Sequence, residues 1–168
     1  LDLKLYTKCL EITEKGLLID CQSSDLIINK SLGLYFLKKY KQSKEEIVKA
    51  IILKPNYFKA QLILLNLEYK FNNQFYVENF INKIFDKRTF VIDKINLAIF
   101  KSRALNNTLL SIKLCKKLIE ISPDIISYKS NLIGLLREAS LFDEALRLCK
   151  LIENKYQFDE NFYINYAA

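Results

Sequence analysis

Four cysteines head the short list of residues that could do chemistry in this 168-residue chain. The chain contains no histidine, so it offers neither a histidine base nor a histidine metal ligand. Cys9, Cys21, Cys115 and Cys149 form no Cys-x-x-Cys pair. Equivalent positions in stacked helices, such as Cys115 and Cys149, lie about 10 Å apart, whereas a disulfide needs α-carbons within about 7 Å. We therefore expect reduced thiols at small core positions, with reactive sensing as the alternative, and no metal or cofactor.

Adjacent carboxylates are the second chemical feature, at Glu45-Glu46, Asp143-Glu144 and Asp159-Glu160. Each pair is predicted to open a helix, where negative charge complements the helix dipole. Paired catalytic acids are the alternative. With three glycines the chain also shows no glycine-rich loop to cradle a phosphate. We expect the chain itself to be non-catalytic.

Basic side chains dominate the middle of the chain, where residues 55–122 carry eleven basic against five acidic residues. Two local clusters stand out in the sequence: Lys38, Lys39, Lys41 and Lys44, and then Lys83, Lys87 and Arg88. A solvated surface explains such clusters. The functional alternatives are an acidic protein partner and a nucleic-acid backbone.

The elements that position these residues follow from the two prolines. Pro55 and Pro123 lie 68 residues apart, twice the 34-residue period of a helix-turn-helix repeat, and each is expected in the first turn of a new helix. Apolar spacing between the breaks is helical, and no stretch alternates with the period of a strand. The sequence therefore predicts an all-α protein with helices near 24–40, 43–53, 56–71, 75–86, 90–105, 108–121, 124–139 and 142–154.

Helix ends and core positions follow from the same period. Leu1 to Ile12 is predicted to form a helix that ends near Gly16, and Ser43, Asn106–Thr108 and Asp124 are predicted to cap helix starts. The 34-residue spacing also predicts two sets of equivalent buried positions. These are Ala50, Ile84, Leu118 and Ile152, and Ile47, Ile81, Cys115 and Cys149.

The segment from Asn131 to Leu146 resembles the tetratricopeptide repeat (TPR) family, in its Asn-Leu-x-Gly stretch and its aromatic-acidic-acidic-Ala-Leu opening of the next helix. Ala50 to Asn56 is similar to the closing Ala-Leu…Pro-Asn of that repeat, and Ser31 to Tyr35 to its Leu-Gly-x-x-Tyr. The resemblance implies a right-handed superhelical array of helix-turn-helix repeats, an α-solenoid. It divides the chain into a preceding second helix, four repeats and a final first helix, at 1–20, 21–54, 55–88, 89–122, 123–156 and 157–168.

In this family the first helix of each repeat lines a concave groove, and the resemblance places a candidate peptide groove on matching positions. The site residues are Asp25, Ile28, Asn29, Tyr35, Lys59, Asn66, Tyr69, Asp93, Asn96, Arg103, Ser127, Asn131 and Arg137, with Leu32, Leu62, Phe100, Ser130 and Gly134 between them. Asparagine occurs on each first helix, and its amide can both donate to and accept from an extended peptide.

These observations favour a non-catalytic cytoplasmic scaffold that binds a protein or peptide, an acidic one among the candidates. One alternative is the recognition arm of an enzyme, for example a transferase, whose catalytic domain lies outside this chain. Another is RNA binding through the basic middle, although a nucleic acid is the less favoured partner. No membrane contact is expected, because the run from Leu62 to Leu67 is far shorter than the ~20 residues that span a bilayer.

The final segment carries a prediction of its own. Phe158, Phe162, Tyr163 and Tyr166 fall at helical spacing. A first helix without its second would leave this aromatic stripe uncovered, so we expect the array to continue further or the chain to self-associate through it.

Overall fold

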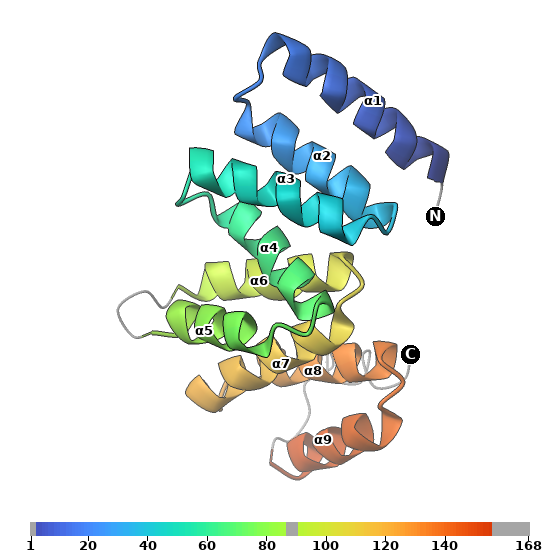
Figure 1. The fold of residues 1–168 in the computed structure, drawn as a ribbon. Coiled ribbons are helices and arrows are strands. Elements are labelled where there is room, and N and C mark those ends of the chain that lie inside the picture. The colour runs from blue at the N-terminus through green and yellow to red at the C-terminus, as the bar shows by residue number, and fades with distance from the viewer. Residues whose placement is uncertain (1–2, 87–90, 156–168) are drawn as a thin grey trace. The chain divides into compact units, whose positions relative to one another are not determined.

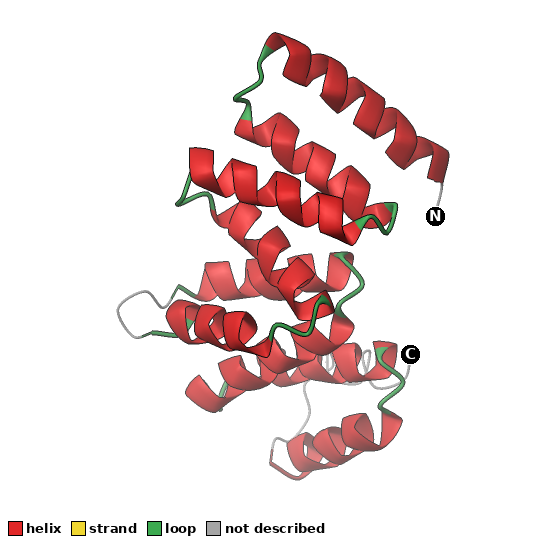
Figure 2. Cartoon of the chain, viewed as in Figure 1, coloured by secondary structure: helices red, strands yellow, loops and turns green. Residues whose placement is uncertain are grey.

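The structure, a computed structural model, describes residues 3–86 and 91–155, and every regular element within them is an α-helix (Figures 1 and 2). This confirms the predicted all-α class. The helices are α1 (Leu3–Ile19), α2 (Ser24–Phe36), α3 (Tyr40–Leu53), α4 (Phe58–Lys70), α5 (Gln74–Ile84), α6 (Ile92–Ala104), α7 (Thr108–Ile121), α8 (Ile126–Glu138) and α9 (Phe142–Lys155). None of these nine is both long and apolar enough to cross a membrane.

The chain forms two compact units, Leu1–Asn82 and Lys83–Ala168. In the first unit, α2 packs on α1 and α3, and α3 packs on α4. In the second unit, α7 packs on α6 and α8, and α8 packs on α9. Each helix thus buries its apolar stripe mainly against its neighbours in the chain, as helical repeats do.

The backbone repeats every 34 residues at the end of each first helix. Lys38, Asn72, Asn106 and Ser140 all have positive φ values, between 55° and 62°. After α2, the Lys39 N–H donates to the Leu34 carbonyl and the Lys38 N–H donates to the Tyr35 carbonyl, both at 2.9 Å. The same two bonds close α4, α6 and α8, so all four helices end in a Schellman motif. None of these positions is a glycine, and the sequence analysis missed them.

Replacing Lys38 with glycine should raise the free energy of unfolding by about 1 kcal/mol. The left-handed region costs most L-residues about 1–2 kcal/mol, and glycine avoids this cost but loses more entropy on folding. Asn72 is the matched control, because asparagine tolerates this region and Asn72→Gly should gain less. Urea denaturation of both variants measures the difference. Equal effects at the two positions would contradict the prediction.

The start of each first helix shows the same period. The residues that precede α2, α4, α6 and α8 are Ser23, Tyr57, Val91 and Ile125, which lie 34 apart and are all extended. None of them donates or accepts a side-chain capping bond. The helix starts are therefore set by backbone geometry rather than by capping side chains.

The prolines lie one turn earlier than the sequence analysis predicts. The Tyr57 N–H donates to the Lys54 carbonyl at 3.0 Å, which closes a turn with Pro55 at its second position. Proline suits this position because its fixed φ matches the turn. Helix α4 begins three residues after Pro55, and α8 begins three residues after Pro123.

Ser43 does not cap a helix, contrary to the prediction. It lies inside α3, fully buried, where its hydroxyl donates to the Ser31 carbonyl at 2.8 Å while the Ser31 hydroxyl donates to the Ser43 carbonyl at 2.9 Å. The Ser111 hydroxyl likewise donates to the Ile99 carbonyl at 3.0 Å, 68 residues further on. Small polar side chains thus join the two helices of a hairpin at a recurring position.

The other predicted caps are also absent. Asn107 directly precedes α7, but its side chain makes no capping bond. Asn106 instead occupies the left-handed position that ends α6. Asp124 lies in the turn before α8, which Ile125 precedes directly.

Gly16 does not end the first helix either, since α1 continues to Ile19. A β-carbon built at Gly16 would lie 2.9 Å from Cδ1 of Leu26 on α2. Glycine is therefore needed at this position for the close approach of α1 and α2, and not for a left-handed helix end.

The predicted core positions are confirmed. Both sets of equivalent residues, 34 apart, are buried: Ala50, Ile84, Leu118 and Ile152, and Ile47, Ile81, Cys115 and Cys149. In the second unit, Cys115, Cys149 and Ile152 belong to one cluster with Leu132 and Leu136 of α8. The 34-residue register therefore holds through the described helices.

Candidate functional site

The first-helix positions of the second unit form the most exposed part of the predicted groove. Asp93, Asn96, Phe100 and Arg103 lie on one stripe of α6, and all four are exposed. The Phe100 ring is 63% exposed, which is unusual for a side chain of its size. This stripe, called the α6 stripe below, combines carboxylate, amide, aromatic and guanidinium groups.

Helix α8 of the same unit carries the next set of predicted positions. Ser127 and Asn131 are exposed, whereas Ser130, Gly134 and Arg137 are half-buried. No atom lies within 4 Å of the place that a β-carbon of Gly134 would take. The surface beside Gly134 is therefore open.

Positions in the first unit are less available. Asp25, Asn29 and Lys59 are exposed and Tyr69 is half-buried, with its pKa raised by burial. The Tyr57 hydroxyl donates to the Asp25 carboxylate, and this bond, which links α2 to the start of α4, is the main cause of the raised Tyr57 pKa. Asp25 therefore already has a partner within the unit.

Three predicted ligand contacts are corrected, because the protein itself encloses them. Ile28 is buried among the apolar side chains of α2. Tyr35 is buried with its ring edge-on to Tyr40. Asn66 is 0% exposed, and its amide donates to the Leu62 carbonyl at 2.7 Å. The proposed row of ligand-binding asparagines therefore loses Asn66.

Arg103 helps to hold two repeats together. Its Nε donates to Glu138 Oε2 at 2.9 Å, and Nη2 donates to the other carboxylate oxygen, so the pair is bidentate. In the first unit, Lys70 Nζ lies 5.7 Å from the centre of the Tyr35 ring. Both pairs are 35 residues apart and join the ends of successive first helices. The equivalent positions Tyr35 and Arg103 thus serve the repeat contact first.

The carboxylate pairs show no catalytic arrangement. Asp143 and Glu144 lie in the first turn of α9, as predicted, and Asp159-Glu160 lies outside the described residues. Glu45 and Glu46 do not open a helix, because α3 already begins at Tyr40. Glu46 instead lies 3.0 Å from the Lys49 ammonium and 3.6 Å from that of Lys30.

All four cysteines are free thiols, as predicted. Cys115 and Cys149 are buried, but Cys9 is half-buried and Cys21 is exposed, so the expectation of core positions fails for Cys21. Burial raises the pKa of Cys115 to about 11 and also raises that of Cys149. Within residues 3–86 and 91–155, no three Cys, Asp or Glu side chains are grouped to hold a metal ion.

The last described hairpin has an apolar hollow of about 290 Å³ between α8 and α9. Its lining comprises Ile133, Arg137, Phe142, Asp143, Ala145, Leu146 and Cys149. Arg137, a predicted groove residue, thus borders this hollow. The aromatic segment 157–168, predicted to mediate self-association, lies outside the described residues and stays a prediction.

Comparison with known proteins supports the fold and does not extend to a family. No protein-family model matches the sequence, and neither does any curated protein. The fold is similar to two crystal structures of MamA, each 15% identical in sequence. One has a TM-score of 0.51 and covers 92% of this chain and 87% of its own; the other has 0.52, with 90% and 92%. The chain is therefore a TPR-like helical-repeat protein in its fold.

Proposed function

We propose that the chain is a non-catalytic scaffold that binds a protein or peptide segment through the α6 stripe and the adjoining face of α8. The observation that carries this proposal is the exposed Phe100 ring, set among Asp93, Asn96 and Arg103. Aromatic side chains surrounded by polar groups are typical anchors of protein interfaces. Amides such as those of Asn96 and Asn131 can both donate to and accept from a peptide backbone.

The arrangement suits an extended peptide better than a small molecule. The stripe runs along one face of α6 and continues as a polar, open surface on α8 beside Gly134. Such a surface offers an anchor and backbone partners, but no enclosed, mostly apolar cavity of the kind that small ligands occupy. The same features support a binding role for the chain without chemistry of its own.

Phe100→Ala should weaken binding of a selected peptide about 10- to 30-fold, the usual loss for an aromatic anchor. Peptides are selected from a random phage-displayed library on the immobilised 168-residue chain, and their dissociation constants are measured by fluorescence anisotropy. Phe75→Ala is the matched control, because Phe75 is 79% exposed but lies on α5. Its affinity should stay within about twofold of the unaltered chain.

Two results would refute this proposal. One is a set of selected peptides whose affinity is the same for Phe100→Ala and Phe75→Ala. The other is tighter binding of single-stranded RNA than of any peptide, with a steep loss of affinity as salt increases, because phosphate contacts produce that dependence.

A further inference from the structure

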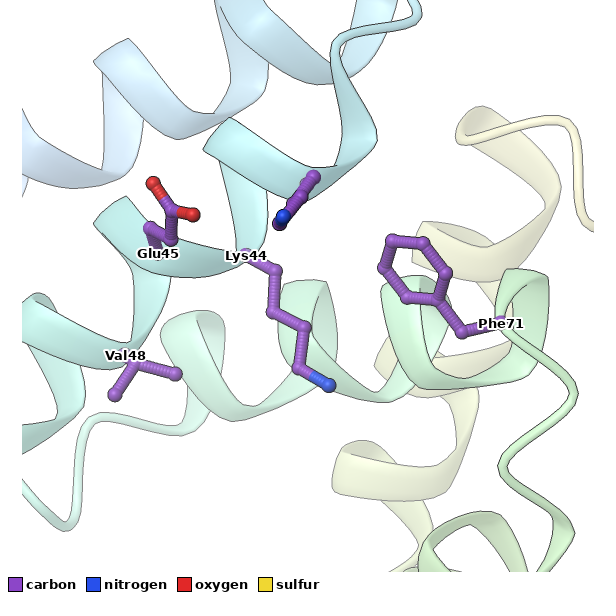
Figure 3. A pocket seen from close by; sticks show the side chains of 5 residues that line it. Lys44, Glu45, Val48 and Phe71 are labelled. Carbon is purple, nitrogen blue, oxygen red and sulfur yellow. The ribbon is translucent and has the colours of Figure 1, made fainter.

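A second hollow lies in the first unit, away from the first-helix positions. It has a volume of about 610 Å³ and is lined by Lys41, Lys44, Glu45 and Val48 of α3, with Phe71 at the end of α4 (Figure 3). We call it the α3 hollow. Val48 and Phe71 are both large apolar side chains with more than a third of their surface exposed. The volume falls in the range of sites that bind ligands.

Lys44 holds the middle of the α3 hollow in place. Its ammonium lies 2.7 Å from Glu68 Oε1 and 5.4 Å from the centre of the Phe71 ring. Glu68 is buried, and Asn73 Nδ2 donates to its other oxygen at 2.8 Å. The Glu68 carboxylate is therefore neutralised inside the protein. In Figure 3 the Lys44 side chain lies between Val48 and Phe71, so its aliphatic stem adds to the apolar lining.

The surroundings of the α3 hollow are strongly basic. Lys38, Lys39 and Lys41 are exposed at the start of α3, where the helix dipole is already positive. Lys70, next to Phe71, has its ammonium 5.3 Å from the centre of the Tyr40 ring. Five lysines thus face two nearby carboxylates, of Glu45 and the paired Glu68. Cations at a helix start cost stability, so local folding does not account for this charge.

We propose that the α3 hollow binds an acidic segment of a partner protein. An apolar side chain of that segment fills the space between Val48 and Phe71, and its flanking carboxylates meet the ammonium groups of Lys38, Lys39 and Lys41. Charge complementarity of this kind favours fast and specific association. The site is separate from the α6 stripe and uses different residues, so it does not depend on the function proposed above.

An acidic peptide fits the lining better than a nucleic acid does. Proteins that bind single strands offer successive aromatic rings along a basic groove. The residues that line the α3 hollow include one ring, Phe71, which is accompanied by the aliphatic Val48 and the stem of Lys44. This lining matches one apolar side chain rather than a run of stacked bases.

The test uses a fluorescein-labelled peptide, acetyl-Asp-Glu-Asp-Phe-Asp-Glu-Leu-Asp-amide, and the 168-residue chain. We expect saturable binding by fluorescence anisotropy with a dissociation constant below about 1 mM. A second peptide, in which serine replaces both apolar residues, should bind at least about tenfold more weakly. No binding up to that concentration, or equal binding of the two peptides, would overturn the proposal.

Variants then locate the site on the protein. Lys41→Glu and Val48→Glu should each weaken the acidic peptide about tenfold. Lys59→Glu is the matched control, since Lys59 is an exposed lysine of α4 in the same unit, and should change affinity less than about twofold. Lys44 is left intact because its loss would strand the buried Glu68 carboxylate. Melting curves for each variant check that the fold is kept.

Three results distinguish the occupants. Equal effects of Lys41→Glu and Lys59→Glu would overturn the proposal, because binding would then reflect net charge alone. Tighter binding of poly(U) than of the acidic peptide, lost in Lys41→Glu, would also overturn it and assign the surface to nucleic acid. Phe100→Ala should leave binding of the acidic peptide unchanged, so this proposal and the α6 stripe can fail separately.

Discussion

Leu118→Ala is expected to lower the free energy of unfolding by about 2–5 kcal/mol, the usual cost of removing a buried leucine side chain. Leu118 is 1% exposed, and α7, on which it lies, packs against both α6 and α8. Leu114 and Cys115 are buried on the same helix. A helix held on two sides cannot easily move to fill the cavity, so we expect a value in the upper part of this range.

Leu109→Ala provides the control for Leu118→Ala. Leu109 lies on the same helix, and removal of its side chain changes helix propensity in the same way. Because Leu109 is 56% exposed, the loss should stay below about 1 kcal/mol. Urea denaturation followed by circular dichroism measures both. Similar losses for the two variants would mean that α7 is not the centre of the second unit.

Alkaline pH is expected to destabilise the second unit through Cys115. Burial raises the pKa of this thiol from 9.0 to about 11, and its Sγ lies 3.3 Å from the Tyr128 carbonyl. Between these two pH values the unfolded chain ionises Cys115 while the folded chain keeps it protonated. The unfolded state therefore binds fewer protons, and the free energy of unfolding falls as pH rises through this window.

The slope of this fall should be about 1.4 kcal/mol per pH unit from one fully linked thiol. Tyrosines and lysines also titrate in this range, so the comparison is with Cys115→Ala, which loses stability at all pH values but lacks this thiol. Unfolding free energies measured from pH 8 to pH 11 should converge for the two proteins. Parallel curves would show that Cys115 does not control the alkaline transition.

The sequence by itself determined the helices and the register of the core. Helix formation is governed by the spacing of apolar residues along a single segment, so the predicted and observed helices agree to within about four residues. Equivalent positions such as Ala50 and Leu118 are buried because each repeat uses the same face to contact its neighbour. Both properties depend on short-range pattern, which the two prolines brought into phase.

The helix ends were harder to predict. Capping was expected from side chains such as Ser43 and Asn106, yet Ser43 lies inside α3 and Asn106 takes a left-handed conformation. Left-handed residues that are not glycine, such as Lys38 and Ser140, leave no mark in the composition. Their spacing of 34 residues is visible only in the backbone.

The candidate site depended on tertiary structure most of all. Asn66 and Asn96 both lie on first helices, but Asn66 is enclosed while Asn96 is exposed. Gly16 looked like a helix end until the side chain of Leu26 was found against it. In each case the decisive neighbour is on another part of the chain, and its distance is set by packing rather than by spacing in the sequence. Local pattern therefore determined which residues are helical, and only the packed helices decided which of them a partner can reach.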